Sequence, residues 1–146
     1  MESIPVTEQL MRQYEILVDS TIQVTNWRLS ANNFYLSVNA AFLAIAAYLY
    51  NFSLLTGVVI GFIGLATTIL WHETIQYYRT LNKAKFIVIH EIEKQLPVPM
   101  FHLEDEHFVK EDRKKATWIE SNISILFGIA YVLIIVVHIF KFFNTV

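Results

Sequence analysis

The sequence predicts an all-α integral membrane protein with three transmembrane helices per subunit, long helical cytoplasmic extensions and assembly into a homo-oligomeric ring. The first observation is composition: 55% of the 146 residues are hydrophobic and only 16% are charged, whereas a soluble domain carries about 25% charged residues. The second is that the apolar residues gather in three long uncharged runs. The third is that two of the polar segments carry amphipathic stripes. Together they argue against a free-standing soluble globule and against a disordered chain.

The first two uncharged runs, 33–50 and 53–71, predict a transmembrane hairpin. At ~1.5 Å per helical residue each run covers about 27 to 29 Å, close to the ~30 Å hydrocarbon core of a bilayer. Only Asn51 and Phe52 separate the two runs, so the helices must be antiparallel neighbours. The run 121–140 predicts the third span. It is rich in β-branched residues, but in lipid a helix satisfies its own backbone hydrogen bonds and is therefore expected.

These spans divide the chain into four segments. They are a cytoplasmic amphipathic helix (1–31), the transmembrane hairpin (32–72), a cytoplasmic helix with a charged loop (73–118), and the third transmembrane helix with a short tail (119–146). Eight of the 11 Lys and Arg residues lie between the second and third spans. By the positive-inside rule this multi-pass protein has its N-terminus in the cytoplasm. Aromatic residues near the predicted boundaries are expected at the membrane surface: Trp27, Tyr48, Tyr50, Trp71 and Trp118.

The polar segments are themselves patterned. Apolar side chains recur at helical spacing over 10–24, and a second stripe continues the hairpin's second helix over 74–96. Pro97 and Pro99 are expected to end that helix, because proline lacks a backbone donor and disfavours helix in the residue before it. The segment 100–115 is predicted to be a charged loop.

Small and polar side chains within the spans predict helix packing. Gly57, Gly61 and Gly64 lie nearly on one face of the second span. Ala40 and Ala44 do the same on the first. Small residues let helices approach closely, either inside one subunit or at an oligomer interface.

Two polar residues inside the spans stand apart from this packing pattern. Asn39 is expected to bond a neighbouring helix, whereas His138 either reaches the headgroups or serves an inter-helix or pore-lining role.

No motif in the sequence predicts catalysis or a cofactor. The pairs His72-Glu73 and His90-Glu91 begin like a zinc-protease motif but lack its second histidine. The chain has no cysteine, and a net charge of −2 gives no reason to expect a nucleic-acid partner. The loop 102–107 is either a solvated charged loop, a pH sensor or a weak candidate for metal binding. Its candidate ligands are His102, Glu104, Glu106 and His107.

One resemblance adds to these inferences. The stretch 71–97, above all Tyr78-Arg79-x-Leu81-Asn82-x-x-Lys85-Phe86-x-Val88-Ile89-His90-Glu91-Ile92-Glu93-x-x-Leu96-Pro97, resembles the RipA family of small octameric bacterial membrane proteins. The entry into the first span, 28–39, is similar to the same family. The resemblance implies a bacterial inner-membrane homo-oligomer, an octamer, linked to survival under stress and without established catalytic activity. The family's Glu-Trp pair after the prolines is missing here, since 101–107 contains no tryptophan.

Within the matching stretch, Asn82 and Lys85 interrupt an otherwise apolar stripe. They therefore predict partners on a neighbouring helix or subunit, for which Glu15 and Asp19 are candidates, and a role in fixing the register of assembly.

The hypothesis that unites these observations is a non-catalytic structural or adaptor assembly that supports stress adaptation or intracellular growth. Its partners would be other copies of itself, the lipid bilayer and unknown cytoplasmic proteins. Two alternatives are an oligomeric pore gated by the cytoplasmic collar, and a pH- or metal-responsive regulator acting through the loop 102–107.

Overall fold

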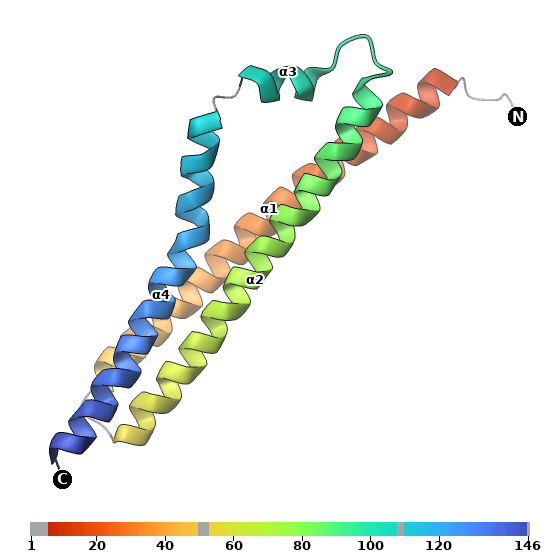
Figure 1. Ribbon diagram of the computed structural model, residues 1–146. Helices are drawn as coiled ribbons and strands as arrows, with labels where there is room; N and C mark the ends of the chain where they lie inside the picture. The colour runs from red at the N-terminus through yellow and green to blue at the C-terminus, as the bar shows by residue number, and fades with distance from the viewer. Residues whose placement is uncertain (1–5, 50–52, 108–109, 146) are drawn as a thin grey trace, which may run out of the picture.

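The computed structural model describes residues 6–49, 53–107 and 110–145, with side chains described over 8–49, 53–107 and 122–144. In these ranges the chain forms four helices: α1 (Val6–Tyr48), α2 (Leu54–Glu93), α3 (Met100–His107) and α4 (Lys110–Thr145). Helices α1 and α2 run side by side as a long antiparallel pair (Figure 1). The start of α1 lies at the end of the molecule near α3, and the C-terminus lies at the other end (Figure 1).

Both helices of the pair are continuous across the predicted boundary between membrane and cytoplasm. The amphipathic N-terminal segment and the first uncharged run form one helix, α1. The second run continues into the stripe at 74–96, as predicted, because α2 extends from Leu54 to Glu93 without a break. Ser53 caps its start, where the side-chain oxygen accepts the backbone N–H of Thr56 at 3.4 Å. The helix ends a few residues before Pro97.

Two stretches of the described chain are long and apolar enough to cross a membrane: α2 and the segment Asn122–Asn144 of α4. They contain the predicted spans 53–71 and 121–140, apart from Ser53, the N-cap of α2, and Ser121. Within the described residues, the run 33–50 is not apolar enough to meet the same criterion of length and hydropathy. Asn33 and Asn39 lower its hydropathy, and α1 ends at Tyr48. The first span therefore stays a prediction.

The prediction of a charged loop over 100–115 was wrong. The chain forms α3 at Met100–His107, and α4 already begins at Lys110. The short helix is stabilised from outside its own sequence, because the carboxylate of Glu93 accepts two of its first backbone N–H groups. A helix start satisfied by a distant side chain carries no local capping signal.

Helix α2 is the centre of the fold, with α1 along its whole length and α4 along its first half (Figure 1). Polar contacts set the antiparallel register of α1 and α2: Tyr14 to Glu93, Ser20 to Lys85, Thr25 to Asn82, Asn32 to Trp71 and Asn39 to Thr68. The residue numbers in these pairs add to nearly the same value. Any α1 residue can therefore be matched to the α2 residue at the same height, meaning the same position along the axis of the helix pair.

Trp71 corrects the prediction of boundary aromatics. Its side chain is fully buried, stacks on Tyr35 with ring centroids 6.4 Å apart, and donates from Nε1 to the side-chain oxygen of Asn32 at 3.0 Å. Trp27 and Tyr48 are exposed, and their position at the membrane surface stays a prediction. Tyr50 and the side chain of Trp118 lie outside the described residues.

Candidate functional site: buried joints and an apolar collar

The glycine stripe of α2 packs on α4 within a single subunit. A Cβ atom at Gly57 would overlap the ring of His138, and one at Gly64 would overlap the ring of Tyr131. Gly61 faces Ile135 in the same way. The stripe is therefore used inside the subunit, against the third predicted span. Ala40 and Ala44, by contrast, are exposed on the outside of α1.

Asn39 joins three helices at the predicted membrane level. It is fully buried, and its Oδ1 accepts the hydroxyl of Thr68 from α2 at 3.0 Å. Its backbone carbonyl accepts the hydroxyl of Tyr131 from α4 at 2.9 Å. The predicted bond from Asn39 to a neighbouring helix is confirmed by the contact with Thr68.

His138 lies between α4 and α2. Its side chain is buried against Gly57, and Nδ1 lies 2.9 Å from the carbonyl oxygen of Ile134, which can only accept a hydrogen bond. Of the two roles predicted for this residue, the position fits inter-helix packing and not an extension toward the headgroups.

Beyond the uncharged runs, the extended parts of α1 and α2 together with α3 form what we call the collar, residues 8–31, 72–93 and 100–107. In the collar, the side-chain nitrogen of Asn82 donates to the hydroxyl of Thr25 at 2.9 Å. Nζ of Lys85 donates to the hydroxyl of Ser20 at 2.6 Å. Both polar residues thus have a partner on a neighbouring helix, as predicted, but neither partner is one of the named carboxylates.

The predicted carboxylate partners of Lys85 were wrong. Glu15 and Asp19 are exposed, on the part of α1 that faces away from α2. Hydroxyls occupy the inner face instead, so the contacts fix the register of α1 on α2 within one subunit.

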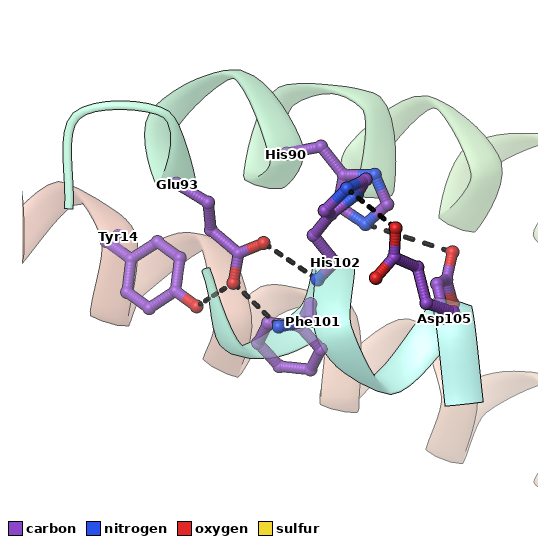
Figure 2. A network of polar contacts seen from close by, with 7 residues as sticks. Tyr14, His90, Glu93, Phe101, His102 and Asp105 are labelled. Carbon is purple, nitrogen blue, oxygen red and sulfur yellow. Dashed lines mark hydrogen bonds and ion pairs between the residues drawn. The ribbon is translucent and has the colours of Figure 1, made fainter. Parts of the chain in front are cut away.

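Glu93 accepts three hydrogen bonds in the collar, and no motif in the sequence predicted this role. Only 1% of it is exposed. Its Oε1 accepts the hydroxyl of Tyr14 at 2.9 Å and the backbone N–H of Phe101 at 2.7 Å, while Oε2 accepts the backbone N–H of His102 at 3.0 Å (Figure 2). One carboxylate therefore ties α1, α2 and α3 together. The available signal was its spacing, four residues after the buried Ile89 on the inner face of α2.

The contact with Glu93 changes the chemistry of Tyr14. The pKa of this phenol is raised to about 12, mainly by burial and further by the hydrogen bond to Glu93 and by the negative charge of that carboxylate. The neutral hydroxyl is the form that can donate to a carboxylate. Tyr14 is therefore held in its neutral, donating form.

Two imidazoles meet where α3 lies on α2. The rings of His90 and His102 are 5.7 Å apart between centroids (Figure 2). Nε2 of His90 lies 3.9 Å from Oδ2 of Asp105, and Nε2 of His102 lies 3.6 Å from Oε1 of Glu106. Two histidine–carboxylate pairs, His90 with Asp105 and His102 with Glu106, therefore lie beside each other.

The metal ligands proposed from the sequence are not gathered into one site. Within the described residues, no group of three or more His, Asp or Glu side chains is arranged to hold a metal ion. The physical reason is the helical form of α3, which keeps His102 and Glu106 on one face and leaves Glu104 and His107 exposed elsewhere.

Large apolar side chains are exposed on the collar. Ile16 and Ile22 project from α1 with 62% and 54% of their surface exposed, and Tyr77 and Ile87 project from α2 with 64% and 59% exposed. Exposed apolar groups in such number mark a surface for association.

An apolar groove lies between α2 and α4, with a volume of about 530 Å³. Its walls include Leu65 and Ile69 from α2 and Ile125, Ile129 and Val132 from α4, and none of the described side chains of α1 lines it. His72 and Glu73 stand at one end, where Nδ1 of His72 lies 3.2 Å from the hydroxyl of Ser124.

Three features define the class of protein: candidate membrane spans, hydrogen bonds buried between helices, and apolar outer faces. The class is a helical membrane subunit that associates with further protein. The chain belongs to the octameric membrane protein family (8xMP), whose model matches residues 11–140. The family description names octameric assembly in a membrane and confirms this part of the resemblance seen in the sequence. No curated protein and no solved structure matches the chain significantly.

Proposed function

We propose that this protein is a non-catalytic octamer of a bacterial inner membrane, with three spans per subunit and its N-terminus in the cytoplasm. In this proposal the octamer is a structural or adaptor assembly that supports stress adaptation or intracellular growth. Membership of the octameric membrane protein family supports the assembly and the membrane. The positive-inside distribution of Lys and Arg supports the orientation.

The observation that carries the proposal is the apolar surface of the collar. From residue 72 to Glu93, α2 extends about 30 Å beyond the end of the uncharged run at Trp71. Tyr77 and Ile87 project from this extension, where lipid tails do not reach them. Leaving such side chains in water costs about 25 cal/mol per Å² of apolar surface. Contact between the collars of neighbouring subunits removes that cost.

The first span is supported by its neighbours. Asn39 in the run 33–50 is bonded to Thr68 in the span 53–71, and its carbonyl accepts Tyr131 of the span 121–140. The three uncharged runs therefore stand side by side at one height, and a bilayer that contains the second and third also contains the first.

An adaptor role is supported by the tip of the collar. Met100 and Leu103 of α3 are exposed there by 59% and 40%, and Val98, in the turn just before α3, by 54%. They lie around α3, at the end of the molecule farthest from the C-terminus (Figure 1). A cytoplasmic protein partner would bind this apolar patch.

A pore has less support. Asn39, Thr68 and His138, conspicuous polar side chains of the described spans, are buried inside the subunit and do not face a shared axis. A lumen walled by the other faces of the spans, which are mostly apolar, would dewet and block ions. We therefore retain the structural assembly as the proposed function.

The experiment that tests the proposal is a mass measurement of the protein in mild detergent. We expect a particle of eight 17.0 kDa chains. Ile87→Glu places a charge on the apolar collar and is expected to dissociate the particle. Gln95→Glu is the control, because it adds the same charge at an exposed polar position just past the end of α2. A monomeric wild-type protein contradicts the proposal.

A further inference from the structure

We infer that in the octamer the exposed face of α1 at Ser37, Ala40 and Ala44 docks into the groove between α2 and α4 of the next copy. The inference rests on the proposed octamer and adds which surfaces meet. The occupant is thus a second copy of this chain, and the contact joins two different faces of the subunit.

The groove has the shape and chemistry of a helix-docking site. It holds about 530 Å³, and its walls are apolar and open on the outside of the subunit: Ile69, Ile125 and Ile129 are 56%, 48% and 54% exposed. At Gly128 in the groove wall, an added Cβ would meet nothing closer than 3.5 Å. Gly128 itself is buried against Thr68 and Leu65 of α2, so no side chain from this position fills the groove.

The height of the groove selects the part of α1 that can fill it. Asn39 lies opposite Thr68, and the hydroxyl of Tyr35 is 3.5 Å from that of Thr74. Groove residues 65–73 of α2 are therefore level with about 34–42 of α1, counted from this register at ~1.5 Å per residue. Rotation about an axis along the membrane normal keeps height unchanged. If α1 of the neighbouring copy fills the groove, this is therefore the part of α1 that enters it.

The exposed face of α1 at this height is made of small residues. Asn33, Ser37, Ala40 and Ala44 follow each other at spacings of four and three, and all four are exposed. Such a face presents a low ridge that enters a groove without displacing its walls. Its polar end also matches: Asn33 is level with Glu73 at the end of the groove, so the amide can donate to the carboxylate of the next copy.

A ring of eight subunits around one axis needs two unlike, complementary surfaces on each subunit. Among the described residues, none of α1 lines the groove, so the ridge and the groove of one subunit can serve two different neighbours. A contact between identical faces would instead close after two copies. The ridge and groove therefore supply the geometry that the family's octamer requires.

Disulfide cross-linking tests the inference directly, because the natural chain has no cysteine. The register places Ala40 of α1 level with Ile129 of α4. We expect membranes that contain both Ala40→Cys and Ile129→Cys chains to form cross-linked dimers upon oxidation. A chain carrying both substitutions is expected to form a ladder up to eight subunits.

The matched control replaces Ala40→Cys by Ile45→Cys, which is also exposed but projects from the other flank of α1. It is expected to give no cross-link with Ile129→Cys. An octameric mass without the Ala40 to Ile129 cross-link, including the case in which lipid fills the groove, overturns the docking surface while the proposed function stands. Cross-linking of Ala40→Cys to itself overturns the unlike pairing. Loss of the octamer in wild-type protein overturns the proposed function itself.

Discussion

Replacement of Glu93 by glutamine tests whether one carboxylate holds the end of the collar together. Glutamine keeps the size of the side chain but replaces one of the two accepting oxygens by an N–H₂ donor. In its better orientation the amide oxygen takes the place of Oε1 and keeps the bonds from Tyr14 and Phe101. The N–H₂ group then faces the backbone N–H of His102, so that two donors oppose each other.

The size of the effect follows from these contacts. A hydrogen bond to a charged group contributes about 1.5 to 3 kcal/mol, and a buried donor left without an acceptor costs about 1 to 3 kcal/mol. Glu93→Gln loses one such bond and weakens the charge assistance of the other two. We therefore expect the docking of α3 to weaken by about 2 to 4 kcal/mol.

Hydrogen exchange measured on the segment 94–107 provides the assay. A loss of 2 to 4 kcal/mol corresponds to exchange that is roughly 30- to 700-fold faster if α3 opens locally. Glu91→Gln is the control, since the pair of Glu91 with Lys94 is exposed and an exposed pair contributes about 1 kcal/mol or less. Equal protection of α3 in the two variants would refute the role of Glu93.

Three further predictions concern other contacts of the fold. First, the pKa of Tyr14 is raised to about 12 in the folded protein. The contribution of Tyr14 to stability is therefore complete below its unfolded pKa of about 10 and is lost as the pH rises through 12. Spectrophotometric titration of the wild type and of Tyr14→Phe checks this. Second, Gly64→Ala forces a methyl group into a ring of α4 and is expected to destabilise the bundle by about 1 to 3 kcal/mol, whereas Gly128→Ala, with 3.5 Å to its nearest neighbour, is expected to cost much less in thermal unfolding. Third, Thr68→Val removes the hydrogen bond to the buried side-chain amide of Asn39 in α1 and is expected to cost about 0.6 to 1.7 kcal/mol of stability. Thr67→Val is the control, because the hydroxyl of Thr67 bonds only its own helix. Equal melting temperatures of the two variants would contradict the role of the bond between Thr68 and Asn39.

The sequence predicted the helices better than their contacts. Runs without charge identified the segments that became α2 and the apolar part of α4, because length and hydropathy are local properties. The continuity of α2 up to the region before Pro97 followed from helical spacing and the position of the prolines. A bond from Asn39 to another helix was also predictable, since a buried amide in an apolar environment needs a partner.

The identity of partners was not predictable, because it depends on how each helix is rotated about its axis. Lys85 was expected to meet a carboxylate of α1, but the hydroxyl of Ser20 faces it. For the same reason Trp71 is buried between helices and not at the membrane surface.

Helix α3 could not be predicted for a different reason. Its residues 100–107 look like a polar loop when read alone, and the group that caps them is Glu93, which stands before two prolines. A helix whose start is stabilised across a turn is visible only once the neighbouring helix is in place.

The continuity of α2 has a mechanical consequence. A single rod without a break, held to α1 by bonds at Asn39, Thr25 and Tyr14, transmits a tilt at the membrane to the tip of the collar. Over an extension of about 30 Å, a tilt of about 10° displaces that tip by about 5 Å. A change in bilayer thickness that tilts the spans is thereby converted into a lateral shift of α3 in each subunit.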